Sequence, residues 1–344
     1  MYLGYYQLMD EPFRLTPDPR FLHLSEPHQA ALTSVLEGIF YRKGLVMITG
    51  PIGTGKTTLV HAALQLLTSK KMAIKSALLF NPTLSRDEFM EMMLEEFEVN
   101  CTSRSKAKRL MALQQMLLDT QRSGGTSVLF IDEAHLLSSE LLEEIRLLGN
   151  ADTHQEKLLQ IVLSGQPELV TMMNRPELSA LQQRIASRAQ LRPLSQAETR
   201  AYIAERLHAA GLDGPTPFSA QAIEAIYKCA RGVPRLLNMV CDASLALGFK
   251  SQRRMIQPDI VDDVAISLGL NQPEPIVEEK RTPAEKILAA PSPKNVTTEP
   301  VSSAVYQKTA VDLLVEPVSS AVYQKTAVDL LIEAMKHKRA TARG

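Results

Sequence analysis

The segment GPIGTGKT at residues 50–57 constrains this chain more than any other feature. It follows a short apolar run, LVMIT at 45–49, and opens a stretch with helical periodicity at 56–67. Glycines in such a loop let the backbone curl, so that its N–H groups and the following helix N-terminus can face phosphate oxygens. The strand–loop–helix context therefore predicts a P-loop in an α/β domain.

The P-loop assigns a role to each side chain that can reach a nucleotide. Lys56 should contact the β- and γ-phosphates, and the Thr57 hydroxyl should ligate Mg²⁺. The sequence thus predicts ATP and Mg²⁺ as ligands. The expected nucleotide-binding residues are Gly50, Pro51, Ile52, Gly53, Thr54, Gly55, Lys56, Thr57 and Thr58.

A second motif, SVLFIDE at 127–133, lies about 75 residues after the P-loop with one strand–helix unit between them. Its apolar run predicts a buried strand that delivers Asp132 and Glu133 to the edge where ligands bind in α/β sheets. Asp132 should hold Mg²⁺, and Glu133 should act as general base on the attacking water. The letters DEAH at 132–135 also occur in helicases, but those need a second motor domain, and too few residues follow position 150 for one.

Strand-like and helical segments alternate through the first part of the chain. Further strands are expected at 74–80 and 158–164, and helices at about 25–39, 85–97, 105–121 and 138–148. Apolar strands separated by helices indicate a parallel sheet covered by helices on both faces. We expect this α/β domain, with an irregular N-terminal arm, to span residues 1–192.

Only helices are expected after Pro193. Ser195 and Glu198 form a capping box for a helix that runs to about Ala210, and further helices fit 219–230, 234–248 and 258–268. These predict a small all-helical lid domain at 193–270.

Residues 271–344 read as a linker-like tail, rich in proline, charge and threonine. The tail contains a tandem repeat of 17 residues, EPVSSAVYQKTAVDLLV at 299–315 and EPVSSAVYQKTAVDLLI at 316–332. Two units are too few to bury a solenoid core. The repeat is either a duplicated linker or a pair of short docking helices for a partner.

Charge and composition exclude several classes of protein. Lysine plus arginine and aspartate plus glutamate both number 38, so no strongly basic balance indicates nucleic acid. No run is long and apolar enough for a transmembrane helix, and the N-terminus lacks a signal-peptide pattern, so a cytoplasmic location is expected. The three cysteines have no CxxC spacing and are interpreted as free, buried thiols.

Six segments together resemble a known family. They are EPFRLTPDPRFLHLS (11–25), the P-loop, FIDEAHLL (130–137), VLSGQPEL (162–169), LQQRIASRAQLRPLS (181–195) and ARGVPRLLN (230–238). In combination they resemble the ExeA/GspA-type AAA+ ATPases and, more distantly, TniB/TnsC-type transposition ATPases and origin-recognition proteins. The resemblance covers residues 1 to about 270 and implies an AAA+ P-loop fold with a helical lid.

The resemblance also implies roles for residues outside the two motifs. The arm from Phe13 to Phe21 would lie near the adenine. Gln166, or Ser164 just before it, would be sensor 1, a polar group facing the γ-phosphate or the attacking water. Arg235 would be sensor 2, reaching the phosphates from the lid.

Arg184 and Arg188 would be arginine-finger candidates directed at the nucleotide of a neighbouring subunit. If 178–189 is helical, these two arginines share one helix face. The implied catalytic set is Glu133, Gln166, Arg184, Arg188 and Arg235.

The implied function is hydrolysis of Mg-ATP at the interfaces of a homo-oligomer that supports assembly of a secretion or surface-polysaccharide export system. An alternative is an ATP-dependent, DNA-binding regulator of the transposition type. A third is a nucleotide-dependent scaffold with little turnover, against which Glu133 argues. Family members often continue into a membrane span and a peptidoglycan-binding domain. This sequence shows neither, so a direct cell-wall role is not expected.

Overall fold

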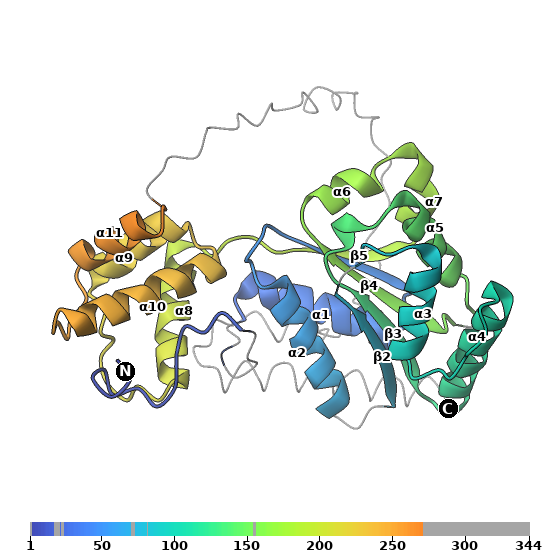
Figure 1. Ribbon diagram of the computed structural model, residues 1–344, viewed down its shortest axis with the longest axis horizontal. Helices are drawn as coiled ribbons and strands as arrows, with labels where there is room; N and C mark the ends of the chain where they lie inside the picture. The colour runs from blue at the N-terminus through green and yellow to red at the C-terminus, as the bar shows by residue number, and fades with distance from the viewer. Residues whose placement is uncertain are drawn as a thin grey trace, which may run out of the picture.

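The computed structural model describes residues 2–16, 21, 24–69, 73–80, 82–153 and 156–270. Its centre is a parallel five-stranded sheet in the order β2-β3-β4-β1-β5 (Figure 1). The strands are β1 (Leu45–Thr49), β2 (Ile74–Leu79), β3 (Thr126–Ile131), β4 (Leu159–Gly165) and β5 (Ile185–Gln190). The predicted fold class, a parallel sheet sandwiched by helices with a helical domain beside it, is confirmed.

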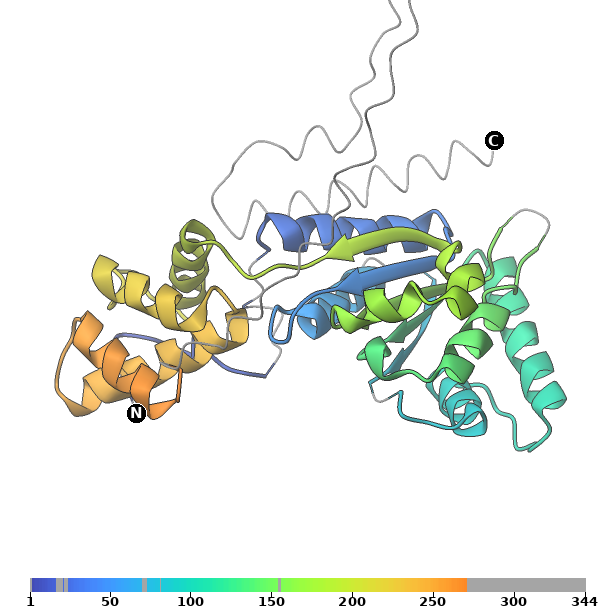
Figure 2. The same ribbon diagram turned by 90° about the horizontal axis from the view of Figure 1, so that it is seen from above.

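Helices cover both faces of the sheet because β1, β3 and β4 carry apolar side chains on both. One face packs on α1 (Glu26–Phe40) and α2 (Lys56–Ser69), with Val46, Ile48 and Phe130 at the contact. The other face packs on α3 (Arg86–Glu96), α4 (Lys106–Arg122), α5 (Ser139–Leu148), α6 (Glu168–Met173) and α7 (Ser179–Gln182). Figure 2 shows α1 on one side of the sheet and α4 on the other.

The fifth strand, β5, was not expected. A shared face for Arg184 and Arg188 required 178–189 to be helical, but α7 ends at Gln182 and an extended strand begins at Ile185. Its residues alternate between half-buried and exposed because β5 lies at the edge of the sheet, beside β1. Arg184 and Arg188 therefore do not share a helix face. Arg184 precedes the strand, and Arg188 is exposed within it.

The helical domain contains α8 (Gln196–Ala209), α9 (Ala220–Ala230), α10 (Pro234–Lys250) and α11 (Pro258–Ser267). The predicted capping box is present: the Ser195 hydroxyl accepts the amide of Glu198, and the Glu198 carboxylate accepts the amide of Ser195. Together these two bonds fix where α8 begins.

The N-terminal arm packs in the core of this helical domain. Tyr6, Leu8, Phe13 and Phe21 are buried there, and the Phe13 ring meets Phe218 edge to face. We had placed the arm with the α/β domain at 1–192, whereas its buried side chains belong to the helical core. Figure 1 shows the arm, in dark blue, running beside α8 and α10.

Glycine 232 determines how the helical domain joins the sheet. Its φ is +72°, and a Cβ there would lie 1.9 Å from the carbonyl oxygen of Leu194. The amide of Leu194 donates to the carbonyl of Gly232 over 2.8 Å. The segment leaving β5 and the start of α10 are thus held backbone to backbone.

Within the described part of the chain, no helix has both the length and the apolar character needed to cross a membrane. Cys101, Cys229 and Cys241 are free thiols, of which only Cys241 is buried. The tail and its tandem repeat lie outside the described residues.

Candidate nucleotide-binding site

The P-loop connects β1 to α2 at the carboxyl edge of the sheet. Gly53 and Gly55 have φ angles of +77° and +95°, which side-chain-bearing residues rarely adopt. His28 of α1 lines the cavity and supports the loop, since its Nε2 lies 2.8 Å from the carbonyl of Thr54 and its Nδ1 lies 2.6 Å from the Ser25 hydroxyl. Ser25 begins α1 as predicted, but its hydroxyl bonds His28 instead of a backbone amide.

Lys56 is buried at the floor of the loop. Its Nζ donates to the carbonyls of Gly50, over 2.9 Å, and Pro51, over 3.0 Å. Burial lowers the pKa of Lys56, and the carboxylates of Glu133 and Asp132 oppose that shift. A desolvated ammonium held by neutral carbonyls is suited to exchange them for phosphate oxygens.

Asp132 follows β3 directly and accepts hydrogen bonds from two hydroxyl groups of the site. Its carboxylate accepts Thr57 Oγ1 over 2.5 Å and Ser164 Oγ over 2.8 Å. Thr57 opens the helix after the P-loop, so the structure brings together the two residues predicted to hold Mg²⁺. A hydroxyl and a carboxylate are hard oxygen ligands of the kind Mg²⁺ prefers, and the donor set fits that ion.

Glu133 extends from this floor into the cavity on a left-handed backbone. Its φ is +51°, an unusual angle for glutamate that marks local strain. The Glu133 side chain is 39% exposed, and its Oε2 lies 3.4 Å from Nδ1 of His135. A carboxylate that is accessible at the phosphate end of the cavity can contact a water molecule there.

A cavity of about 570 Å³ opens above these residues, between the sheet and the helical domain. The P-loop, Glu133 and Gln166 line its floor, and the arm and lid close its other side. The residues from the arm and lid are Arg14, Leu15, Thr16, Phe21, Leu194, Tyr202, Arg206, Pro234, Arg235 and Asn238. The arm thus forms part of the wall that the resemblance associates with the adenine.

Arg235 approaches the P-loop from the start of α10. Its backbone amide donates to the carbonyl of Gly53 over 3.2 Å, and its Cβ lies against Gly53. The Arg235 side chain is exposed at the cavity, and no described residue pairs with its guanidinium. It therefore remains available to a ligand.

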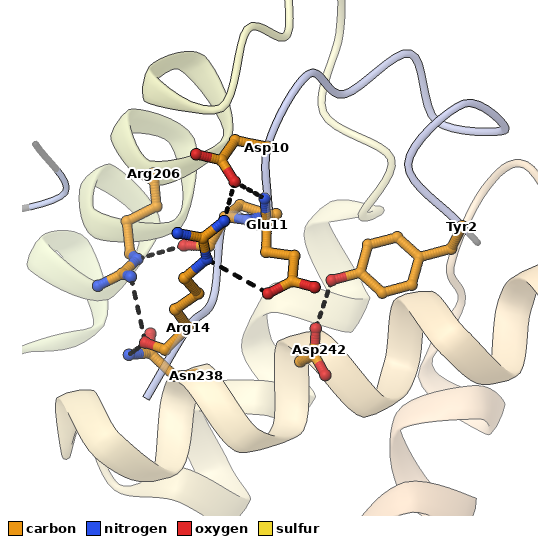
Figure 3. A network of polar contacts seen from close by, with 8 residues as sticks. Tyr2, Asp10, Glu11, Arg14, Arg206, Asn238 and Asp242 are labelled. Carbon is orange, nitrogen blue, oxygen red and sulfur yellow. Dashed lines mark hydrogen bonds and ion pairs between the residues drawn. The ribbon is translucent and has the colours of Figure 1, made fainter. Parts of the chain in front are cut away.

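A buried polar network ties the arm to the lid (Figure 3). Arg206 of α8 donates from Nε to the carbonyl of Pro12 and from Nη2, over 3.4 Å, to that of Arg14. Its Nη1 donates to the Tyr202 hydroxyl, which in turn donates to Asn238 Oδ1 over 2.8 Å. The guanidinium also lies 5.1 Å from the centre of the Phe21 ring. This wall of the cavity therefore combines residues of the N-terminal arm with residues of α8 and α10.

The two finger candidates lie away from this cavity. Arg184 Nη1 donates to the carbonyl of Arg146 at the end of α5 over 2.8 Å, at the sheet edge where the strands begin. Arg188 projects from the edge strand β5. Neither lines the nucleotide cavity of its own chain.

Sequence reasoning missed three residues of the site: His28, His135 and Arg206. His28 and Arg206 act through contacts with residues 26 and 194 positions away, which no local pattern encodes. His135 is the last residue of the DEAH sequence at 132–135, which was interpreted only as a possible helicase motif.

Comparison with known proteins agrees with this geometry. Residues 39–173 match the model of the AAA domain family AAA_22. The chain is 36% identical over 262 residues to general secretion pathway protein A of Aeromonas hydrophila, a match that covers 76% of this chain and 47% of that protein. The chain thus spans about half the length of that relative.

Solved structures share the fold at low sequence identity. The ORC2 protein of Aeropyrum pernix, in ADPNP–ADP complexes, aligns with a TM-score of 0.56 and 16% identity over 74% of this chain and 71% of that one. Cdc6p of Pyrobaculum aerophilum aligns with a TM-score of 0.59 and 18% identity over 76% and 71%. With the secretion-protein match and the domain match, the chain belongs to the ExeA/GspA-type AAA+ ATPases.

Proposed function

We propose that this protein binds Mg-ATP in the cavity between sheet and lid and hydrolyses it to ADP and phosphate. The observation that carries the proposal is the contact between Thr57 and Asp132. These predicted Mg²⁺-binding groups come from separate elements, yet their oxygens lie 2.5 Å apart. Bound Mg²⁺ would neutralise charge on the phosphate oxygens.

Four residues of the chain would bind the phosphates and activate the attacking water. Lys56 gives up its bonds to the loop carbonyls and binds the β- and γ-phosphates, while Arg235 reaches them from the lid. Glu133 accepts a proton from the attacking water. Gln166, which lines the same floor, orients that water or the terminal phosphate.

Hydrolysis depends on a neighbouring subunit in this proposal. Neither Arg184 nor Arg188 lines its own cavity, which supports action of one of them on a nucleotide held by another copy. An arginine supplied in trans accelerates phosphoryl transfer by about 10³–10⁵-fold. We therefore propose a cytoplasmic homo-oligomer with ATP sites at its interfaces.

The process served is assembly of a secretion or surface-polysaccharide export system, and the partners are components of that machinery. The support is the likeness to general secretion pathway protein A. The competing function, ATP-dependent DNA binding, makes a different prediction. Binding to random duplex DNA would weaken steeply with salt, because each phosphate contact releases a counterion. Binding of that kind in the presence of ATP would replace the export proposal.

Two substitutions test the chemistry. Lys56→Ala should weaken binding of a fluorescent ATP analogue at least tenfold, or about 1.4 kcal/mol. Glu133→Gln should bind ATP normally and hydrolyse it roughly 10²-fold more slowly, because the amide cannot accept the proton. Unchanged affinity in the first variant or undiminished turnover in the second would contradict the respective role.

A further inference from the structure

Two consecutive carbonyl groups of the P-loop are held by residues outside the loop. The backbone amide of Arg235 in α10 donates to the carbonyl of Gly53 over 3.2 Å. The imidazole of His28 in α1 contacts the next carbonyl, that of Thr54, over 2.8 Å. The proposed chemistry gives His28 no role in binding, although this residue is buried at the wall of the nucleotide cavity.

The partners of His28 determine where its ring carries a proton. A backbone carbonyl can only accept a hydrogen bond, so Nε2 must be the donor to Thr54. The other ring nitrogen, Nδ1, lies 2.6 Å from the hydroxyl of Ser25, and in the neutral imidazole it accepts that hydroxyl. Ser25 is itself buried, directly before α1. The contact with Ser25 therefore sets the ring so that its Nε2–H faces the loop.

The contact with Thr54 fixes the orientation of one peptide group of the loop. In a planar trans peptide the C=O and N–H bonds point in opposite directions. His28 holds the Thr54 carbonyl, so the amide of Gly55, which belongs to the same peptide group, points away from the imidazole. No described residue accepts a hydrogen bond from that amide. An uncommitted N–H in a P-loop is the kind of donor that binds phosphate oxygens.

Gly55 allows the imidazole to approach this peptide group closely. Its φ is +95°, and a Cβ at this position would lie 3.3 Å from Nε2 of His28. Glycine is therefore needed here both for the backbone angle and for the contact with the ring. His28 thus packs directly against the peptide group that it holds.

We infer that His28 is a positioning residue for the nucleotide: its Nε2–H holds the Thr54 carbonyl so that the Gly55 amide faces the phosphate groups. The inference rests on the proposed function, in which the P-loop binds ATP. Both ring nitrogens of His28 are engaged by protein groups, so the ring acts through the loop. Its effect should therefore appear in the affinity for the polyphosphate.

Substitutions at position 28 separate the contact with Thr54 from the contact with Ser25. The side-chain amide nitrogen of glutamine stands at the place of Nε2 along the side chain, whereas that of asparagine stands at the place of Nδ1. His28→Ala and His28→Asn should weaken binding of a fluorescent ATP analogue about tenfold, and His28→Gln should stay within about threefold of wild type. His208→Ala, at an exposed position of α8, is the matched control and should leave the Kd unchanged.

Pyrophosphate, which has neither base nor ribose, reports on the phosphate-binding loop alone. As a competitor of the analogue, pyrophosphate should bind His28→Ala more weakly than wild type by about the same factor, and His28→Gln should recover most of that loss. All variants are compared as full-length chains, and their thermal unfolding is measured without ligand. Equal losses of affinity in the Asn and Gln variants, with matching drops in Tm, would overturn the positioning role in favour of packing.

Lys56→Ala distinguishes failure of this inference from failure of the proposed function. If Lys56→Ala binds the analogue more weakly than wild type while His28→Ala binds it as tightly as wild type, the positioning role is overturned and the nucleotide site stands. If wild type does not bind the analogue, or Lys56→Ala binds it equally well, the proposed function fails and this inference with it. Rescue by glutamine and not by asparagine, with both the analogue and pyrophosphate, is the expected result.

Discussion

The Nε atom of Arg206 donates a 2.5 Å hydrogen bond to the carbonyl of Pro12, which lies 194 positions earlier in the sequence. This bond makes the arm part of the lid. The arm and lid together wall the cavity, with residues from Arg14 to Asn238. The pocket that would hold the base of a nucleotide is thus assembled by tertiary packing, in contrast to the locally encoded P-loop.

Arg206→Lys should weaken the hydrogen bonds that hold the arm to the lid. The guanidinium has donors in a planar fork for three partners, whereas an ammonium on a flexible stem cannot serve all three. We expect a loss of about 2 kcal/mol in the free energy of unfolding and a severalfold weaker nucleotide Kd. Urea unfolding and titration with a fluorescent ATP analogue measure both. Arg200→Lys, at an exposed position of the same helix, should change neither. If the two variants behave alike, Arg206 does not hold the arm.

Gly232→Ala should disrupt the junction between sheet and lid. The residue has positive φ, and the added methyl would meet the carbonyl oxygen of Leu194 at 1.9 Å. Backbone strain and the clash together should cost at least about 3 kcal/mol of unfolding free energy. Gly214→Ala is the control, because nothing lies within 4 Å of a Cβ at that position. A loss in Gly232→Ala no larger than in Gly214→Ala would show that the junction adjusts freely.

Alanine substitutions of Ser164 and Gln166 should show which of the two residues acts as sensor 1. Ser164 is fully buried and donates to Asp132, so Ser164→Ala should weaken the Mg²⁺ dependence of nucleotide binding. Gln166 lines the cavity, so Gln166→Ala should lower kcat with little change in nucleotide Kd. Titrating Mg²⁺ against a fluorescent ATP analogue, together with steady-state turnover, distinguishes the two. The reverse pattern would assign the sensor role to Ser164.

The sequence predicted most accurately what is local. β1 is a nearly continuous apolar run, and β3 and β4 contain apolar runs at 128–131 and 161–163, so burial of all three was predictable. A glycine-rich loop directly after such a strand indicates a P-loop. The edge strand β5 was missed because Ser187, Arg188 and Gln190 give it no apolar face of the kind that marks a buried strand. The arm was misplaced for a different reason: its partners Arg206 and Phe218 are distant in sequence and leave no periodic signal near residue 13.

Glu198 should make the lid sensitive to acid. Burial alone would raise its pKa, but hydrogen bonds from Arg192 and Ser195 outweigh burial and lower the pKa to about 2. A depressed folded-state pKa stabilises the protein above the unfolded value near 4.5, and that contribution is lost as pH falls toward 2. The Glu198→Gln variant should lose roughly 1 kcal/mol at neutral pH, since the pair with Arg192 is partly solvated. Its free energy of unfolding should then fall less steeply than that of wild type between pH 5 and 3. Parallel curves for the two proteins would contradict this.

The proposed assembly is motivated by the position of Arg184 and Arg188 relative to the P-loop. β5 runs parallel to β1 and pairs Ile185 with Leu45 and Arg188 with Met47, so Arg184 lies one residue before the level at which β1 begins. The P-loop begins after Thr49, about 16 Å further along at roughly 3.3 Å per residue. Neither arginine lines its own cavity. In the proposed assembly, one of these arginines assists hydrolysis of a nucleotide held by a neighbouring copy.

Activity should therefore depend on the concentration of protein. Specific activity should rise with concentration through the assembly range, and the double variant Arg184→Ala/Arg188→Ala should bind nucleotide but lose most turnover. That variant offers intact nucleotide sites, and Lys56→Ala offers intact arginines, so mixing the two inactive proteins should restore part of the activity. The turnover of the single variants Arg184→Ala and Arg188→Ala should show which arginine is the finger. Because Arg184 also caps the end of α5 through the Arg146 carbonyl, Arg184→Ala should lower Tm whichever arginine acts. Specific activity that is flat on dilution, with no rescue on mixing, would mean that both arginines are structural and that the enzyme works as a monomer.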